Sequence, residues 1–258
     1  MAKITLSSLR HSYLPDPKAA EDYALKSIDL DWQDGGAYAL LGPSGCGKST
    51  LLNVLVGKLI PDSGSVSFQG QSVLGRKPHE ITQMGISRVF QTPEIFADLT
   101  VIENVLIPCF SKRDGSFKMN SIDSVAGQRD MREQAEAMLD DVNMLDKLNM
   151  TASSMSRGDK RRLEMAMCLV QEPQLLLLDE PTAGMARADT ENTIQLLKDI
   201  RTKRGITMAI IEHDMNVVFS LAERITVLAQ GTPLVEDTPD KIKDHPKVRE
   251  AYLGEAQV

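Results

Sequence analysis

The sequence lacks an apolar run long enough to span a bilayer, and its N-terminus lacks the apolar core of a secretory signal. It has only three cysteines, Cys46, Cys109 and Cys168, which lie far apart without the spacing of a metal site. These absences exclude a helical membrane span and a cysteine-ligated metal centre. We expect a cytoplasmic protein whose thiols are buried or incidental.

An excess of positive charge is also missing, because 29 Lys and Arg face 36 Asp and Glu and the formal net charge is −7. That balance argues against a general nucleic-acid-binding surface. No internal repeat and no Pro/Ser-rich linker divides the chain. With 258 residues, of which 42% are hydrophobic and 25% charged, the chain can bury a large core. We expect residues 1–258 to form one domain.

A glycine-rich segment fits the phosphate-binding pattern G-x-x-x-x-G-K-[ST] at every fixed position, and its residues are Gly42, Pro43, Ser44, Gly45, Cys46, Gly47, Lys48 and Ser49. A short apolar strand over 37–41 and a helix over 49–56 flank it, as this pattern requires. Glycines let several backbone N–H groups point at one anion beside the positive end of the helix. Lys48 is then expected to reach phosphate oxygens and Ser49 to hold Mg²⁺. The alternative is a glycine-rich turn with an exposed lysine.

Two acids follow a run of four leucines. Residues 175–178 predict a buried strand, and Asp179 and Glu180 come directly after it, at the sheet edge where parallel strands bind ligands. Asp179 suits the support of Mg²⁺, and Glu180 suits the polarisation of a water molecule. The alternative is that both only cap the next turn, although two carboxylates beside a core need partners.

Two ring-bearing residues complete the set of candidates. His213 follows an apolar strand over 206–211 and lies between two acids, so we interpret it as functional rather than as an isolated surface histidine. Tyr13 precedes a loop over 14–18 and is a candidate for stacking on an adenine ring, with Tyr23 in reserve. The alternative for Tyr13 is a half-buried strand residue.

The order of predicted elements indicates an α/β protein. Antiparallel strands are expected over 4–36, helices over 92–154, and alternating helices and buried strands from 156 onward. We predict a core with a mostly parallel sheet and an antiparallel β subdomain over 1–91 and 156–258, with an inserted helical subdomain over 92–155. Within the insertion we expect a mobile polar loop over 111–127 and an amphipathic helix over 128–148.

Five motifs in fixed order together resemble the motif set of the ATP-binding-cassette ATPases: Gly42–Ser49, Gln91, Ser156–Lys160, Leu175–Glu180 and His213. The resemblance extends over essentially the whole chain, and it implies a P-loop ATPase that uses ATP and Mg²⁺. It places Tyr13 on the adenine and residues 42–50, including Thr50, around the phosphates. Ser49 and Gln91 are implied as Mg²⁺ ligands, with Asp179 supporting the metal.

The same resemblance assigns catalytic roles. Glu180 is implied as the general base for attack by water, and His213 as the contact to the γ-phosphate, with Lys48 and Gln91 completing the catalytic set. Ser156, Gly158 and Asp159 correspond to the signature loop, which binds the nucleotide held by a second copy. A serine hydroxyl, a glycine and a helix N-terminus suit a phosphate.

The chain departs from the family pattern at two places. Arg157 stands where the signature loop usually has a glycine, and Asp159 stands where glutamine is commonest. Ala186 stands where the loop after Glu180 often has an aspartate that communicates across the dimer. These departures put the geometry of the phosphate contact and the coupling between the two sites in question.

The resemblance further implies partners. These are a second ATPase subunit, identical or paralogous, membrane permease subunits docked on 92–155, and indirectly a solute-binding protein, but no nucleic acid. The ATPase is then expected on the cytoplasmic face of the inner or plasma membrane. Segments 156–164, 173–184 and 212–231 and the tail from 246 to 255 resemble ATPases of branched-chain amino acid importers.

Other members of the family remain as alternatives. Segment 24–57 is more similar to ATPases of sugar or glycerol importers, and the Tyr-Leu-Gly tail at 252–254 also occurs in lipopolysaccharide export. A nucleotide-binding module without turnover is a third possibility, which the presence of Lys48, Glu180 and His213 disfavours. We predict an ATPase that drives uptake of a small solute, most similar to the amino acid branch.

Overall fold

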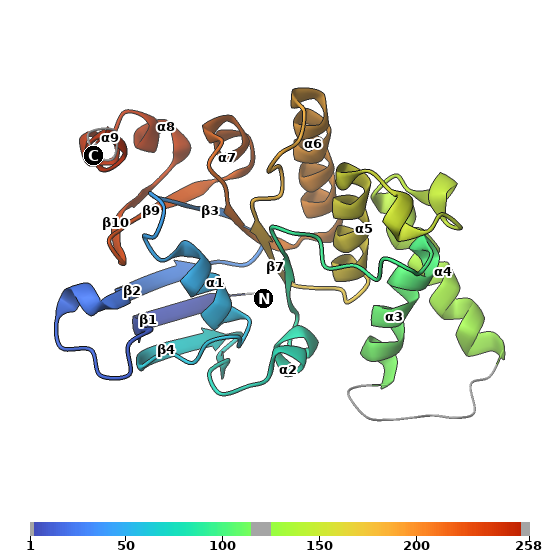
Figure 1. Cartoon of the computed structure of the whole chain (residues 1–258), viewed down its shortest axis with the longest axis horizontal. Helices are drawn as coiled ribbons and strands as arrows, with labels where there is room; N and C mark the ends of the chain where they lie inside the picture. Colours follow the sequence, from blue (N-terminus) through green and yellow to red (C-terminus); the bar gives the residue numbers. More distant parts are fainter. Residues whose placement is uncertain (1–2, 115–124, 254–258) are drawn as a thin grey trace.

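The computed structural model describes residues 3–114 and 125–253, which form two β-sheets with helices packed around them (Figure 1). The larger sheet consists of β3 (Ala37–Leu41), β6 (Ile86–Val89), β7 (Leu175–Asp179), β8 (Thr207–Ile211), β9 (Arg224–Ala229) and β10 (Thr232–Asp237). Its order is β10-β9-β3-β8-β7-β6, and every neighbouring pair is parallel except β9 with β10. The mostly parallel sheet expected from the sequence is confirmed.

The smaller sheet is antiparallel and contains residues from the N-terminal part of the chain. Its strands are β1 (Ile4–Ser12), β2 (Tyr23–Trp32), β4 (Ser63–Phe68) and β5 (Gln71–Ser72), in the order β2-β1-β4-β5. Ile28, Leu30 and Trp32 alternate with exposed residues along β2 and are buried. One face of this sheet therefore packs on the core while the other meets solvent.

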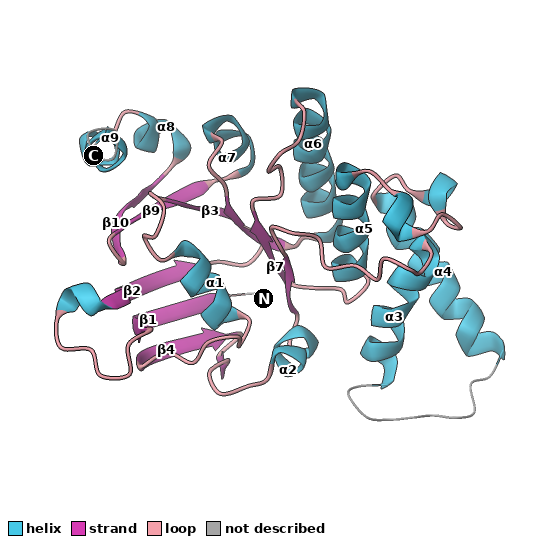
Figure 2. Cartoon of the chain, in the orientation of Figure 1, coloured by secondary structure: helices cyan, strands magenta, loops and turns pink. Residues whose placement is uncertain are grey.

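Helices make up most of the remaining structure (Figure 2). They are α1 (Lys48–Leu55), α2 (Pro78–Gln83), α3 (Val101–Asp114), α4 (Val125–Asp141), α5 (Arg157–Leu169), α6 (Arg187–Arg204), α7 (Met215–Leu221), α8 (Pro239–Lys243) and α9 (Pro246–Leu253). Short 3-10 turns occur at Ala20–Asp22, Leu145–Lys147 and Ala152–Ser154.

The four leucines of β7 show why the larger sheet is covered on both faces. Leu176 and Leu178 pack in one apolar cluster with residues of α3, α4, α5, α6 and α7. Leu175 and Leu177 point the other way, into a cluster that contains α1 and the smaller sheet. Successive strand residues face opposite sides, so a strand covered on both faces is apolar throughout. The acids that end β7 are thereby placed at the rim of this layered core.

The helical insertion differs in detail from the prediction. Both ends of the loop expected over 111–127 are helical, because residues 111–114 belong to α3 and residues 125–127 belong to α4. Residues 115–124 lie outside the described residues. α3 continues past Pro108 because Val105 and Cys109 are buried against α4 and α5, and this packing outweighs the proline. The helix expected over 128–148 ends at Asp141, two residues before Asn143 adopts a φ of 57°. α2 was not predicted.

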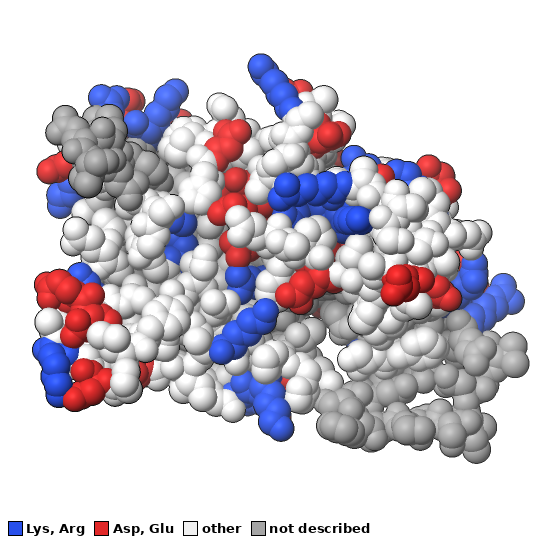
Figure 3. Space-filling model, in the orientation of Figure 1, with Lys and Arg blue, Asp and Glu red and all other residues white. Residues whose placement is uncertain are grey.

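Charged side chains are mixed on the surface. On the face shown in Figure 3, Lys and Arg are interspersed with Asp and Glu rather than gathered into one stripe. Within the described ranges, 3–114 and 125–253, no helix combines the length and apolar character needed to cross a bilayer.

Candidate active site

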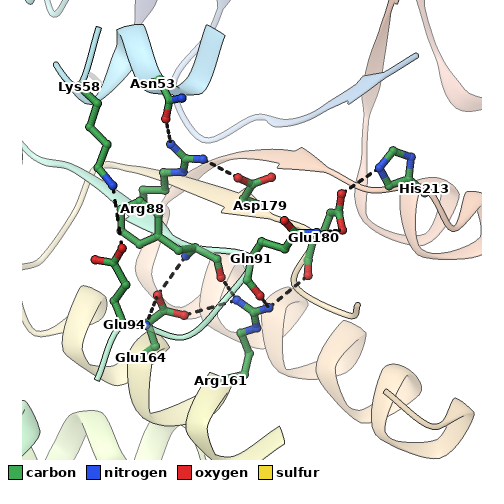
Figure 4. A network of polar contacts seen from close by, with 11 residues as sticks. Asn53, Lys58, Arg88, Gln91, Glu94, Arg161, Glu164, Asp179, Glu180 and His213 are labelled. Atoms are coloured by element: carbon green, nitrogen blue, oxygen red, sulfur yellow. Dashed lines mark hydrogen bonds and ion pairs between the residues drawn. The ribbon is translucent and has the colours of Figure 1, made fainter. Parts of the chain in front are cut away.

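Four parallel strands bring the predicted catalytic residues to one edge of the larger sheet. β3, β8, β7 and β6 are neighbours, and their carboxyl ends lead into Gly42, His213, Glu180 and Gln91 respectively. Ligands of open parallel sheets bind at this edge. Residues that are far apart in the sequence therefore meet, as Figure 4 shows for Gln91, Glu180 and His213.

The phosphate loop has a backbone that only glycine tolerates at its two ends. Gly42 has a φ of 145°, and a Cβ added there would lie 2.1 Å from the carbonyl oxygen of Leu228. Gly47 has a φ of 105°, and its Cβ would lie 2.6 Å from the carbonyl oxygen of Ala24. Gly47 is also the N-cap of α1 and makes no side-chain cap bond. The loop is thus shaped by close backbone approach, as an anion cradle requires.

The Lys48 ammonium lies inside this loop. Its side chain is buried, and Nζ donates to the carbonyl oxygens of Gly42 at 2.6 Å and Pro43 at 2.9 Å and lies 3.5 Å from Cys46 Sγ. Ser49, the next residue, is exposed at the start of α1. The cation and the hydroxyl predicted to serve the phosphates and the metal are therefore adjacent at the mouth of the loop.

Tyr13 lies beside the phosphate loop with most of its side chain exposed. Its hydroxyl is 3.0 Å from Thr50 Oγ1, and its ring meets the ring of His11 edge-on at 4.9 Å. Tyr13, Tyr23 and Gly45 line a pocket of about 500 Å³. The half-buried strand tyrosine is thus the wrong alternative, because Tyr13 is 63% exposed and follows the end of β1.

The Glu180 carboxylate contacts two of the other catalytic candidates. Gln91 donates from Nε2 to its Oε2 at 2.6 Å, and His213 Nε2 lies 2.9 Å from its Oε1 (Figure 4). Glu180 also has a φ of 48°, a left-handed conformation that a residue with a Cβ rarely adopts. Such strain is retained where the surrounding structure requires it, and it favours a functional role for this carboxylate.

Asp179 is held from the side of β6. Its side chain and that of Arg88 are 9% and 7% exposed, and Arg88 Nη2 lies 2.5 Å from Asp179 Oδ2. The acid is therefore buried with a charged partner, as burial of a carboxylate requires. Sequence reasoning did not single out Arg88, although a charged residue among the apolar residues Ile86, Val89 and Phe90 was a usable signal.

Three further residues that sequence reasoning missed, Glu212, Arg161 and Glu164, bind the backbone of the segments that carry Glu180 and Gln91. Glu212 is buried and accepts from the backbone N–H and hydroxyl of Thr182, at 2.8 and 2.5 Å, in the turn after Glu180. Arg161 is buried and donates to the backbone carbonyls of Phe90 and Gln91, the latter at 2.6 Å. These contacts attach the turns that carry Glu180 and Gln91 to the core.

Glu164, on α5, binds the backbone on both sides of Gln91. Its Oε1 accepts from the backbone N–H groups of Phe90 at 3.0 Å and Glu94 at 3.3 Å, and its Oε2 lies 3.4 Å from Arg161 Nη1. Burial raises the pKa of Glu164 to about 7, against the lowering effect of the two backbone donors and of Arg161. The sequence signal for Arg161 and Glu164 was a pair of opposite charges three residues apart on a helix that otherwise packs against the core.

The signature segment lies elsewhere. Ser156 caps α5 by accepting from the Asp159 N–H at 3.1 Å, and its hydroxyl donates to Asp159 Oδ2 at 2.9 Å. Asp159 is also paired with Lys147 at 2.8 Å. Ser156, Gly158 and Asp159 line a pocket of about 240 Å³ that is distinct from the one beside the phosphate loop. The structure thus does not bring these three residues together with residues 42–50.

The two departures from the family pattern lie near one another. A Cβ added to Gly184 would be 2.6 Å from Arg157 Nη1, so the Arg157 guanidinium packs against the turn that follows Glu180. Ala186 is the N-cap of α6 and makes no side-chain cap bond. The signature segment and this turn are therefore in direct contact within one chain.

The donors present suit a magnesium ion. Ser49 offers a hydroxyl, Gln91 an amide oxygen that its contact with Glu180 does not use, and Asp179 a carboxylate. These are hard oxygen ligands, and Mg²⁺ sites that include phosphates need only one or two carboxylates from the protein. In the described part of the chain no group of three or more His, Cys, Asp or Glu side chains forms a metal site of protein ligands alone.

A sequence model described as ABC transporter matches residues 25–183, which is more than half of the chain. The chain belongs to the ABC transporter ATPases. The family and the fold class expected from the sequence are thereby confirmed. A second model, described as branched-chain amino acid ATP-binding cassette transporter, matches residues 234–258.

Relatives and solved structures agree with this assignment. The chain is 34% identical to the high-affinity branched-chain amino acid transport ATP-binding protein BraF of Pseudomonas aeruginosa and 36% identical to LivG of Escherichia coli, in each case over 90% of this chain and 92% of the relative. The ADP conformation of the ATP-binding cassette MJ1267 superposes with a TM-score of 0.83 at 28% identity, over 98% of this chain and 99% of that chain. A dimeric post-hydrolysis state of MJ0796 bound to ADP and Pi superposes with a TM-score of 0.76 at 28% identity, over 92% and 98%.

Membership of the family establishes the general activity of this ABC ATPase. It binds ATP and hydrolyses it as the nucleotide-binding subunit of an ABC transporter. Such subunits pair with one another and associate with membrane permease subunits. The activity predicted from the five motifs is therefore confirmed at this level.

Proposed function

We propose that this ABC ATPase energises the uptake of branched-chain or related amino acids through separate membrane subunits. The observation that carries the substrate class is the match of residues 234–258 to the C-terminal segment of branched-chain amino acid cassettes. None of the residues assigned to the nucleotide site falls within 234–258, so this similarity reports the transporter branch rather than ATP binding. The similarity to BraF and LivG over 90% of the chain supports the same branch.

Within one subunit, the residues at the sheet edge divide the work of binding the nucleotide. Tyr13 stacks on the adenine, and residues 42–50 surround the phosphates with backbone N–H groups and the Lys48 ammonium. Ser49, Gln91 and Asp179 are the residues that would hold Mg²⁺. A bound Mg²⁺ supplies neutralisation of phosphate charge as the terminal phosphoryl group is transferred to water.

Glu180 acts as the general base for the attacking water. Its two oxygens are occupied by different neighbours, Gln91 at 2.6 Å and His213 at 2.9 Å, so the carboxylate is held in one orientation. A water that donates to this carboxylate passes its proton to Glu180 as its oxygen bonds to the γ-phosphorus, and the bond from that phosphorus to the bridging oxygen breaks to release ADP. His213, half exposed beside Glu180, is the residue that senses this phosphate.

The second half of each site comes from another copy. Ser156, Gly158 and Asp159 line a pocket separate from the one beside the phosphate loop, so they serve the nucleotide of a partner subunit. Two nucleotides then hold two subunits together, and hydrolysis releases them. The partner is a second copy or a paralogue, and ATP binding and hydrolysis become closing and opening of the pair.

The docking region for the permease subunits is the helical subdomain over 92–155, inserted in the core formed by 1–91 and 156–258. Ile107 and Phe110 of α3 are 37% and 39% exposed, so this helix offers apolar surface to a partner. Beside them, Pro108, Phe90 and Glu164 line a pocket of about 270 Å³ between α2, α3 and α5. This docking holds the ATPase on the cytoplasmic face of the membrane, with the solute-binding protein on the other side.

Purification of the tagged chain with its membrane partners, followed by uptake assays in proteoliposomes, tests the substrate class. We expect ATP-dependent uptake of radiolabelled leucine or isoleucine in the presence of the solute-binding protein, and none with a complex that carries Lys48→Ala. ATP-dependent uptake of a sugar or glycerol, with no uptake of amino acids, would replace the proposed substrate class while leaving the ATPase assignment intact.

A further inference from the structure

Arg88 is a buried cation that no step of the proposed mechanism uses. It lies on β6, three residues before Gln91, and its side chain is 7% exposed. One terminal nitrogen, Nη2, contacts Asp179 Oδ2 at 2.5 Å, and the other, Nη1, donates to Asn53 Oδ1 at 2.7 Å (Figure 4). The planar guanidinium therefore bridges the end of β7 and the helix α1.

The two ends of this bridge belong to elements that carry candidate metal ligands. Asn53 lies four residues after Ser49 on α1, so both side chains lie on one face of that helix. Arg88 contacts Asp179 through Oδ2, and within the described residues no hydrogen bond or ion pair involves Asp179 Oδ1. The guanidinium thus sets the distance between Asp179 and the helix of Ser49, and it leaves one carboxylate oxygen for the metal side.

The third candidate ligand is also connected to this group. Arg88 Cζ lies 4.8 Å from the centre of the Phe90 ring, and Lys58 Nζ lies 4.1 Å from the same ring. Phe90 is the residue directly before Gln91. One guanidinium therefore contacts Asp179 directly, the helix that carries Ser49 through Asn53, and the residue that precedes Gln91.

We propose that Arg88 is a positioning residue for the metal site, which holds Ser49, Gln91 and Asp179 in the arrangement that Mg²⁺ requires. This inference rests on the proposed function of those residues. If Arg88 were only a counter-charge for the buried Asp179 carboxylate, Arg88→Lys would leave the metal affinity unchanged, and loss of the charge would raise it. Removal of a nearby positive charge would strengthen the attraction of Asp179 for a divalent cation, whereas loss of positioning weakens it.

The test measures metal affinity separately from nucleotide binding and turnover. Arg88→Lys keeps the charge but replaces the rigid fork by a single point donor that cannot hold Asn53 and Asp179 together. We expect the full-length variant to bind ATP in EDTA within about twofold of wild type, because the phosphate loop is unchanged. In the presence of ATP, its affinity for Mn²⁺, followed by electron paramagnetic resonance, should fall by about 10-fold or more, as for other loss of outer-shell support.

Two further variants keep the test decisive. Arg204→Lys makes the same change in a partly buried pair with Asp141, remote from the sheet edge, and should leave Mn²⁺ affinity unchanged. Asn53→Ala releases only one arm of the bridge and should give a smaller loss of Mn²⁺ affinity than Arg88→Lys. If Arg88→Lys does not fold, Asn53→Ala decides, and unchanged Mn²⁺ affinity in that variant would overturn the proposal.

The outcomes separate this inference from the function on which it rests. Wild-type protein whose ATP binding shows no response to Mn²⁺ or Mg²⁺ would remove the proposed metal site itself. A normal wild-type response with unchanged or tighter Mn²⁺ binding in Arg88→Lys would overturn only the positioning role. Equal loss of ATP binding with and without metal would also overturn it, because Arg88 would then support the fold rather than the metal.

Discussion

Replacement of Glu180 by Gln is the most direct perturbation of the proposed chemistry. The amide keeps the shape of the carboxylate but cannot accept a proton from water. Its NH₂ group must also face either Gln91 Nε2 or His213, which now lie 2.6 and 2.9 Å from the two carboxylate oxygens. The change therefore removes the base and disturbs one of its two contacts, while the phosphate loop is untouched.

The size of the effect follows from the role. Loss of a positioned general base slows a reaction by about 10²–10⁴-fold, which corresponds to about 3–5 kcal/mol of activation free energy. Steady-state phosphate release at saturating ATP and Mg²⁺ measures this loss. ATP affinity should stay within about fivefold of wild type, since one misplaced hydrogen bond outside the loop is worth about 1 kcal/mol. Because ATP is bound but not hydrolysed, the variant should accumulate as an ATP-dependent dimer in size-exclusion chromatography.

The matched control is Glu191→Gln, an exposed acid on α6 whose only ion pair in the described part of the chain is with Arg187 four residues earlier. It should release phosphate at the wild-type rate. Phosphate release by Glu180→Gln within about fivefold of wild type would refute the assignment of Glu180 as the base, because less than about 1 kcal/mol would then depend on it.

Lys48→Ala should abolish measurable ATP binding in a fluorescent-nucleotide titration, and normal affinity would contradict the phosphate-loop assignment. Burial raises the pKa of Glu164 from 4.5 to about 7, so the unfolded chain releases this proton at lower pH than the folded chain and wild-type stability falls as pH rises through that window. Glu164→Gln should remove this pH-dependent loss of unfolding free energy, which is about 3 kcal/mol at most. Equal slopes of unfolding free energy against pH for the variant and wild type would contradict the role of Glu164. Gly42→Ala should destabilise by about 1–3 kcal/mol more than Gly45→Ala in urea unfolding, because a Cβ at 42 meets Leu228 at 2.1 Å whereas nothing lies within 4 Å of one at 45. Equal urea midpoints would contradict that difference.

Local patterns predicted the elements that local forces decide. The run of four leucines predicted β7 because a strand covered on both faces is apolar at every position. The glycines at 42 and 47 predicted the loop because their positive φ angles are a property of the residue type. By contrast, the loop expected over 111–127 was partly wrong, since the burial of Val105 and Cys109 keeps α3 helical beyond Pro108.

The supporting residues could not be found in this way. Arg88, Arg161 and Glu164 have no motif, and each gains its role from a neighbour on another element. Arg161 reaches carbonyls of the segment at 90–91, which is 70 residues away in the sequence. A charge within a strand or helix pattern indicates that a partner exists, but it does not say which residue the partner is.

The sequence by itself determined the phosphate loop, the two acids at the end of the four-leucine run and the family, because residue type and short spacing specify these features. The tertiary structure decided which of the predicted residues share a site. The strand order β3-β8-β7-β6 brings Gln91, Glu180 and His213 together at one edge, while α5 carries Ser156 to a separate pocket. It also placed the Arg88 guanidinium between Asp179 and Asn53, because a buried carboxylate requires a partner that only the packing of β6 against β7 and α1 could supply.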